Sequence, residues 1–516
     1  MNALLESLRR DCAPRAVHDE GWCVRVAIAE GALPAAGRLI ADAGARLSGI
    51  IAEQHDGDYV LRYPFWFTDS RPWLMLEAAT GSDHTVPSLS PVIYAADWPE
   101  REIEDLFGLH FSEHPRLGNF VLHDEVWPEG VAPMRHEFES ARILGGPSPY
   151  ARQQVVHAEG SFTVPVGPVY TDIGESGQFL IETIGEEIIH VDTRLFYKYR
   201  AIEKRAEGKT PADALLLVER LNGTASFAHA LAAAQAIERA TGAPVPARAA
   251  TLRCFWAEFE RLRNHAATIA GLCKSTGLAV PTSLLYACVE DLLRLSAEAS
   301  GHRYLFGLLR PGGLNAGLDD AAVVGVAERA GNIAARLMRI AGELFFDNGF
   351  LDRLEEVGIV GSDLAKHYDL VGPIGRASGR QGDLRIAQPY ASYDALEINE
   401  ATASEGDNFA RLRVFLDEVA ESARLLPLLA TALPAGPVTS AVPVRAGVAL
   451  GWAEAPAGAS ACFVRIDNDG RIARLRLMPP AVINWHVFHR AAEEFTFQDF
   501  PITLASFGLS MAEQDR

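Results

Sequence analysis

The sequence of 516 residues lacks the closely spaced cysteines of several metal-binding classes. No two of its six cysteines have C-x-x-C spacing: they are Cys12, Cys23, Cys254, Cys273, Cys288 and Cys462. Structural zinc sites and self-contained iron–sulfur clusters draw on neighbouring thiolates, so the spacing argues against both. Scattered single cysteines are typical of reduced, mostly buried thiols in a cytosolic protein.

Positive charge, a signal peptide and long apolar runs are also missing. The formal net charge of -20 argues against nucleic acid as a partner, because phosphate binding needs a cationic surface. The N-terminus, MNALLESLRRDC, has no apolar core of signal-peptide length. No uncharged apolar run approaches the roughly 20 residues of a membrane span. The nearest run is alanine-rich, carries His229 and Glu238, and predicts a buried core helix.

The patterning predicts an α+β protein with a small N-terminal α+β domain over residues 1–145. LLESLRRDC and LPAAGRLIADAGARL have helical periodicity, and GIIAEQHDGDYVLRYPFWF predicts two strands around an HDGD turn. WLMLEAAT and PVIYAADW are expected to be further strands. A stretch rich in glycine and proline predicts a linker near residues 138–155.

Residues 155–516 are expected to form a large, mainly helical domain with β-hairpins at its start and near its C-terminus. The helical period dominates from Tyr197 to Leu433, and such helices need one another to bury their apolar faces. ACFVRIDNDGRIARLRLMPP predicts a hairpin that turns at DNDG. The segment GPIGRASGRQG (372–382) could cradle an anion, but it lacks G-x-G-x-x-G, and we favour a structural or interface loop.

Several long motifs resemble known subunits. ADWPEREIEDLFGLHFSEHPRL (96–117) resembles the signature of the 30-kDa subunit of respiratory complex I. GEEIIHVDTRLFYKYRAIEKRAEGKT, VERLNGTASFAHALAAAQAIE, LRPGG and GRASGRQGDLRIAQPYASYD resemble both the 49-kDa subunit and the large subunit of group 4 nickel–iron hydrogenases. The fusion of both subunits in one chain resembles the formate hydrogenlyase or hydrogenase-4 type, and the resemblance covers nearly the whole chain.

The resemblance implies that four metal-binding cysteines have been replaced. In the hydrogenases, C-G-x-C begins the helix that follows VER, and D-P-C-x-x-C lies near the mature C-terminus. These positions fall on Asn222, Ala225, Ser510 and Glu513. Amide, hydroxyl and carboxylate groups are hard ligands, unsuited to a nickel–iron centre that needs soft thiolates. The sequence ends at EQDR, and we expect no C-terminal extension of the kind removed after nickel insertion.

Complex I also lost these cysteines and has a quinone pocket in their place. The resemblance puts Gly223 at the position of its quinone-pocket tyrosine, and Tyr170 and Gly174 where its histidines fall. The familiar quinone-binding groups are therefore missing. Tyr170 could donate a hydrogen bond to a carbonyl group, although a core or loop tyrosine is the interpretation we favour.

Two neighbouring residues are retained. The resemblance places Arg220 near the terminal iron–sulfur cluster of the small subunit, where a cation stabilises the reduced cluster; the alternative is an ion pair with Glu219 or Glu260. His229 either faces the same interface or caps the core.

We therefore expect a subunit on the cytoplasmic side of a membrane-bound oxidoreductase complex, coupling redox events to ion translocation. It would bind no metal or cofactor itself, pack against a small subunit that holds a 4Fe–4S cluster, and contact antiporter-like membrane subunits. Two alternatives are an active NADH:quinone-type subunit that reduces quinone or another acceptor in a remodelled pocket, and an assembly or scaffold protein.

Glu513 is the candidate proton relay. Asn222, Ala225, Ser510 and Glu513 are expected to lie close together, and a carboxylate partly removed from water there could exchange protons at working pH. The alternative is a solvated glutamate in a frayed tail.

Overall fold

The N-terminal part of the protein is built on a six-stranded mixed sheet. The computed structural model describes residues 1–516 apart from 56, 129, 140–154, 157 and 171–174. The main strand order is β1-β2-β6-β5-β3, and β4 pairs with β5. β2 and β6 are parallel, and the remaining pairs are antiparallel. The strands are β1 (Ala16–Asp19), β2 (Cys23–Ile28), β3 (Ala45–Leu47), β4 (Ile51–His55), β5 (Asp58–Phe67) and β6 (Trp73–Ala79).

Three helices accompany this sheet: α1 (Asn2–Cys12), α2 (Leu33–Asp42) and α3 (Asp97–Phe107). The helix over LLESLRRDC and the two strands around HDGD are confirmed, whereas the helix predicted over LPAAGRLIADAGARL ends at Asp42 and its last residues form β3. The strand predicted over PVIYAADW is wrong, because this segment is a 3-10 turn that leads into α3. Asp97, Pro99 and Glu100 suit the first turn of a helix, and this start signal outweighs the strand propensity of the preceding Val, Ile and Tyr. A short parallel pair, β7 (Thr85–Pro87) and β8 (His110–Ser112), completes this part.

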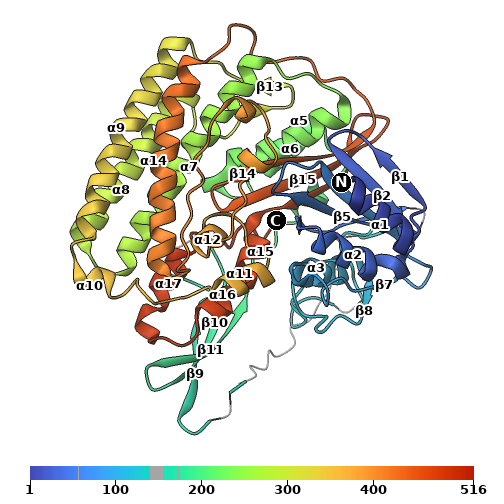
Figure 1. Ribbon diagram of the computed structural model, residues 1–516, viewed down its shortest axis with the longest axis horizontal. Helices are drawn as coiled ribbons and strands as arrows, with labels where there is room; N and C mark the ends of the chain where they lie inside the picture. The colour runs from blue at the N-terminus through green and yellow to red at the C-terminus, as the bar shows by residue number, and fades with distance from the viewer. Residues whose placement is uncertain (56, 129, 140–154, 157, 171–174) are drawn as a thin grey trace.

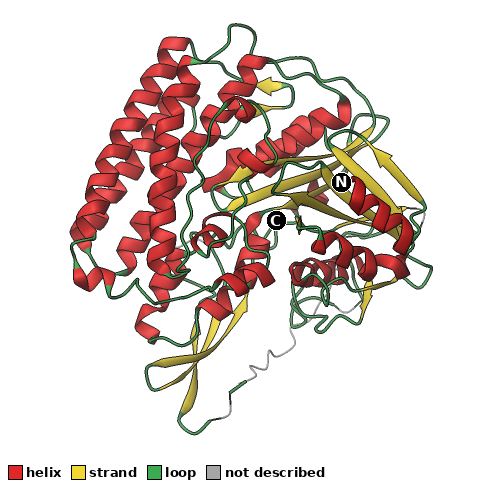
Figure 2. Cartoon of the chain, viewed as in Figure 1, coloured by secondary structure: helices red, strands yellow, loops and turns green. Residues whose placement is uncertain are grey.

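Long helices form the other side of the molecule (Figures 1 and 2). α14 packs against α7 and α9, and α8 packs against the same two helices. Their packing buries the apolar faces that each helix alone would leave in water. The long helices are α7 (Ala247–Ser275), α8 (Ala279–Ser300), α9 (Asp320–Leu344) and α14 (Asn408–Thr431). None of the helices within the described ranges combines the length and the hydropathy that crossing a membrane requires.

Two three-stranded antiparallel sheets replace the two predicted hairpins. β10 and β11 gain β9, and the DNDG hairpin of β15 and β16 gains β14. The alanine-rich α6 (Ser226–Thr241) packs against β14 so closely that a Cβ at Gly451 would lie 2.1 Å from the Ala232 carbonyl oxygen. The strands are β9 (Ser161–Val166), β10 (Gln178–Ile184), β11 (Glu187–Arg194), β14 (Gly447–Ala455), β15 (Gly458–Ile466) and β16 (Ile472–Met478).

Two large hydrophobic cores hold these layers together. The first joins the long helices, α6 and the β14–β16 sheet. The second joins the N-terminal sheet with β10, β11 and the C-terminal helices. In it, Phe179 of β10 packs against Trp485, Phe488 and Phe500. The C-terminal helices are α15 (Pro480–His486), α16 (Phe488–Ala491) and α17 (Phe500–Ser506), and the shorter helices before α6 are α4 (Ile202–Ala206) and α5 (Pro211–Val218).

The segment GPIGRASGRQG has the structural role that we favoured. It begins with the short helix α12 (Gly372–Ala377). Arg376 is buried and pairs with Glu418 at 2.5 Å and Glu454 at 3.0 Å, so its charge is neutralised inside the core.

Candidate functional site

Asn222 starts the turn that leads into α6. Its side-chain oxygen accepts hydrogen bonds from the backbone N–H and the hydroxyl of Thr224, both at 2.9 Å. Asparagine is a favoured residue for this role, because its short side chain reaches the free N–H groups of a helical turn. The amide nitrogen of Asn222 is left to donate elsewhere, and it donates to Glu513 Oε1 at 2.8 Å. The predicted proximity of Asn222 and Glu513 is thereby confirmed.

The C-terminal segment returns to the interior after α17 (Figure 1). Glu513 is only 1 % exposed, so the solvated-tail interpretation is wrong. The physical reason is a clamp formed by Arg200. Its guanidinium donates to the carbonyl oxygens of Ala512 and Asp515 in the tail, and to those of Arg220 and Leu221 ahead of α6. Arg200, which is half-buried, therefore joins the two segments that meet at the site.

Glu513 lies in a small buried polar cluster. His229 Nε2 is 3.2 Å from Glu513 Oε1, and His229 Nδ1 is 2.9 Å from Ser460 Oγ. The other carboxylate oxygen of Glu513, Oε2, is buried and has no hydrogen-bond partner among the described residues. Over the same residues, His229 is the one ion-pair partner recorded for Glu513. His229 is 1 % exposed, so its side chain lies in the core and has almost no surface of its own.

The other two replaced positions contribute differently. Ala225 is buried and supplies no polar atom. Ser510 donates to Glu175 Oε1 at 2.7 Å, and Glu175 Oε2 accepts from the Met511 N–H at 2.6 Å. Glu175 follows the loop of the first hairpin, so it links that loop to the tail.

The positions compared with a quinone pocket offer no free donor in the described residues. The Tyr170 hydroxyl donates to the Gly177 carbonyl at 2.9 Å, which makes it a loop tyrosine. Gly223 faces the ring of Tyr304, which a Cβ at position 223 would meet at 4.0 Å. Gly174 lies outside the described residues.

Arg220 remains accessible. Its side chain is 52 % exposed, and its guanidinium lies 3.4 Å from Glu219 and 5.0 Å from the ring centroid of Phe306. Glu260, the other expected partner, instead accepts from the backbone N–H groups of Phe227 and Ala228, both at 2.8 Å. Glu219 is buried, but the Arg220 side of this contact is exposed, so the guanidinium stays accessible to a neighbour.

The donor set at this site does not fit a nickel–iron centre. An amide, a hydroxyl and a carboxylate stand where soft thiolates are needed. All six cysteines are buried, and burial raises the pKa of the Cys254 and Cys462 thiols, which keeps them protonated. The described residues bring together no group of three or more His, Cys, Asp or Glu side chains suited to a metal ion.

Three family models match the chain in order along its length. The model described as respiratory-chain NADH dehydrogenase, 30 Kd subunit, matches residues 27–142, and that of the 49 Kd subunit matches residues 276–446. The nickel-dependent hydrogenase model matches residues 200–269, which include Asn222, Ala225 and His229. Successive segments of the chain are thus similar to subunits of NADH dehydrogenase and of nickel-dependent hydrogenase.

Hydrogenase and NADH-quinone oxidoreductase subunits resemble the chain over most of its length. Formate hydrogenlyase subunit 5 of Escherichia coli is 28% identical over 83% of this chain and 77% of its own length. Hydrogenase-4 component G of the same species is 27% identical over 89% of this chain and 81% of its own. An NADH-quinone oxidoreductase subunit of Bacteroides fragilis is 27% identical over 75% of this chain and 78% of its own. These relatives are subunits or components of oxidoreductase complexes.

Three contributors to the site were missed in the sequence. Arg200 ends the FYKYR string inside one of the motifs that carry the resemblance, and its position there is the signal that it gives. Glu175 and Ser460 come from other strands and loops, and local patterns carry no signal for such long-range contacts.

Proposed function

We propose that the protein is a peripheral subunit, without a nickel site of its own, of a membrane-bound oxidoreductase complex. The similarity to subunits of formate hydrogenlyase and NADH-quinone oxidoreductase supports membership of such a complex. The donor set of Asn222, Ser510 and Glu513 supports the loss of nickel. In this proposal the chain works on the cytoplasmic side of the membrane, against a small subunit with a 4Fe–4S cluster and antiporter-like membrane subunits.

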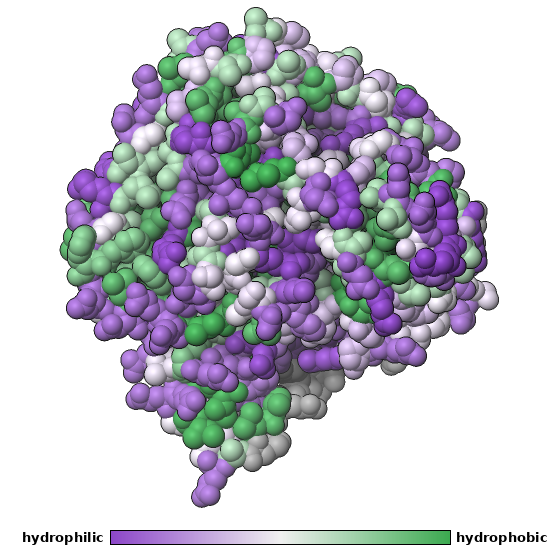
Figure 3. Space-filling view, viewed as in Figure 1, coloured by the Kyte–Doolittle hydropathy of each residue, from purple (hydrophilic) through white to green (hydrophobic). Residues whose placement is uncertain are grey.

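Exposed apolar side chains support contact with partner subunits. The β9–β11 sheet projects from the body, and apolar side chains gather over it at the lower end of the molecule (Figures 1 and 3). Phe162, Val169 and Ile184 are 50%, 87% and 41% exposed there. Exposed apolar side chains that gather in one place favour contact with a partner protein that covers them. Arg220 is accessible enough to approach a partner's cluster.

The chemical role that we propose is proton transfer through Glu513. The observation that carries it is a buried carboxylate joined to Asn222 and His229, with one oxygen unpartnered and no Arg or Lys paired with it in the described residues. Glu513 would hold a proton on a carboxylate oxygen and pass it to neutral His229 at Nε2, which leaves a carboxylate beside an imidazolium whose Nδ1–H donates to Ser460 Oγ. A charge change at this buried cluster would couple redox events to ion movement.

Purification from native membranes tests the composition of the complex. We expect the iron–sulfur subunit and membrane subunits to co-purify and nickel to be absent. Stoichiometric nickel that survives mild chelation would refute the nickel-free site. The isolated chain, reconstituted with iron and sulfide, should give no cluster signal by electron paramagnetic resonance, and a stoichiometric signal would place a cluster in this chain.

Glu513→Gln tests the proton role. The amide keeps an acceptor for Asn222 and His229 but cannot titrate, so proton-coupled turnover of the assembled complex should fall by about a hundredfold or more. Glu6→Gln, at an exposed position far from the site, is the matched control. A Glu513→Gln complex that assembles and turns over at the parent rate would leave Glu513 without a role in chemistry.

A further inference from the structure

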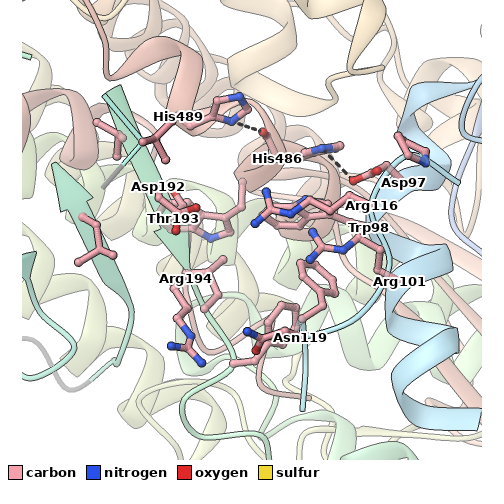
Figure 4. Close-up of a pocket in the computed structure, with 18 of the residues that line it drawn as sticks. Asp97, Trp98, Arg101, Arg116, Asn119, Asp192, Thr193, Arg194, His486 and His489 are labelled. Atoms are coloured by element: carbon pink, nitrogen blue, oxygen red, sulfur yellow. Dashed lines mark hydrogen bonds and ion pairs between the residues drawn. The ribbon is translucent and has the colours of Figure 1, made fainter. Parts of the chain in front are cut away.

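A large cavity lies away from the Glu513 cluster, between the N-terminal and C-terminal parts of the fold. Its volume is about 740 Å³. Its walls come from α3, the loop that follows β8, strand β11 and helices α15 and α16 (Figure 4). Sites for small molecules are typically of this size.

Two arginines face this cavity from the same side (Figure 4). Arg101 is 6% exposed; its Nη2 donates to the Gly118 carbonyl at 3.2 Å, and its guanidinium lies 4.3 Å from the ring centroid of Phe120. Its Nε is buried without a hydrogen-bond partner among the described residues. Burial and then the charge of Arg116 lower the pKa of Arg101, so the two cations oppose each other. Arg116 is exposed, and no ion pair is recorded for its side chain within the described ranges.

The acids nearest to Arg101 are engaged with other groups. Asp97 lies 3.3 Å from His486 Nε2 and 3.4 Å from His114 Nε2. Asp105 accepts from three backbone N–H groups of the loop, at 2.6 Å to 3.2 Å. Glu104 accepts from the Gly118 N–H at 2.6 Å. Among the described residues, therefore, no carboxylate forms an ion pair with Arg101 or Arg116.

The remaining walls are neutral or anionic. Burial lowers the pKa of His486, and it lowers that of His489 to about 4, so both rings are uncharged near neutral pH. Arg194 is paired with Glu125, while Asp192 on β11 lines the cavity from the side opposite Arg101 and Arg116 (Figure 4). Arg101 and Arg116 would attract an anion that binds here, and Asp192 on the opposite side would repel it.

We propose that this cavity binds a small soluble compound that carries a phosphoryl group, which Arg101 and Arg116 hold. Guanidinium groups present paired donors that match phosphoryl oxygens, and an anion between them would relieve their repulsion and give Arg101 Nε an acceptor. Asp192 favours a ligand whose other end offers hydroxyl donors. The formal net charge of -20 opposes general anion binding, so binding would depend on this local pair.

Calorimetric titration of the full chain with inorganic pyrophosphate tests the proposal. We expect saturable binding at millimolar concentration or below. Arg116→Gln should weaken it by about tenfold or more, because a charge-assisted contact is lost. Asp192→Asn should tighten it, because a repelling carboxylate is removed. Arg38→Gln, another exposed arginine of the same region that does not line the cavity, should leave the affinity unchanged.

Two further results decide the outcome. Absence of binding, or equal weakening by Arg116→Gln and Arg38→Gln, would overturn the site. Phosphatidylglycerol vesicles form a second arm: sedimentation with vesicles that depends on Arg116, without pyrophosphate binding, would replace the soluble ligand with a lipid headgroup. Neither arm involves redox turnover or nickel, so failure here leaves the proposed function standing.

Discussion

Glu513 and Arg516 lie three residues apart in the same buried segment, but their surroundings differ in charge. Arg516 lies between Glu102 of α3, at 2.5 Å, and Glu203 of α4, at 3.2 Å. Arg476 of β16 pairs with the same two glutamates at 2.6 Å and 3.3 Å. Glu513 accepts a hydrogen bond from Asn222 and shares one with His229 Nε2, and no arginine or lysine pairs with it in the described part of the chain.

This difference separates an acid that holds the fold together, Glu102, from Glu513, the acid to which we assign proton transfer. Burial opposes ionisation of Glu102, but the charges of Arg476 and Arg516 outweigh it and lower its pKa to about 2. Glu102 therefore stays charged at working pH and fixes α3 to β16 and the tail. Glu513 is buried beside a histidine and has one oxygen without a partner among the described residues, and these are the features on which the proposed proton transfer rests.

Disrupting the buried ion pairs of Glu102 with Arg476 and Arg516 should have the largest effect on stability. Glu102→Gln leaves two buried guanidinium groups, those of Arg476 and Arg516, to share one carboxylate, Glu203, so we expect the free energy of unfolding to fall by about 3–5 kcal/mol. Urea unfolding followed by tryptophan fluorescence measures this. Glu6→Gln, exposed on α1, is the control and should change little.

Glu102 should stabilise the folded protein only over a defined pH range. Its pKa is lower in the folded protein, about 2 against an ordinary 4.5, so its stabilisation is complete above about pH 4.5 and is lost as the pH falls toward 2. The parent protein and Glu102→Gln should converge in stability over that range. A constant difference would mean that the cluster does not act through charge.

Glu100 lies on the same helix as Glu102, but within the described residues it has no arginine or lysine partner. It therefore shows what burial does to a glutamate without a paired cation. Burial raises its pKa to about 8 from an ordinary 4.5, so the folded protein holds the proton more tightly. Stability should then decline as the pH rises from 4.5 to 8, by about 1.4 kcal/mol per pH unit. Glu100→Gln should remove this decline, seen as a gap in unfolding midpoint that widens toward alkaline pH; a parallel shift at every pH would contradict the assignment.

Glu513→Gln should have a much smaller effect on stability than Glu102→Gln. The amide oxygen can still accept from Asn222 and His229, and no buried cation loses a partner, so the change should stay within about 1 kcal/mol. The same urea experiment measures it. A loss as large as that of Glu102→Gln would make Glu513 a structural acid and remove the contrast.

The smallest expected effect concerns Arg220 and depends on the proposed small subunit. An exposed charge about 8 Å from a cluster, screened by water, contributes about 0.5 kcal/mol. Arg220→Met should therefore lower the cluster's reduction potential by about 20 mV, because a lost cation disfavours the added electron. A redox titration of the assembled complex measures this, and Arg220→Lys should retain the parent potential. An unchanged potential in Arg220→Met would assign the residue to its contact with Glu219.

Local patterns were enough for the long helices and for the strands beside the HDGD and DNDG turns. The helical period located α7 and α9, and DNDG located the turn between β15 and β16, because these signals arise from residues close together in the chain. β9 and β14 were missed, since each becomes a strand by pairing with a distant or later partner. PVIYAADW was misassigned, because a helix start overrode strand propensity.

By itself, the sequence determined the chemistry available at the site. It showed that the four positions hold Asn222, Ala225, Ser510 and Glu513, and the motifs around them indicated the family. Only the tertiary structure decided that Glu513 is buried and that Ser510 turns toward Glu175 instead of Asn222. The physical reason is that Arg200 and Arg516 anchor the tail through contacts with residues hundreds of positions away, and no local pattern encodes such contacts.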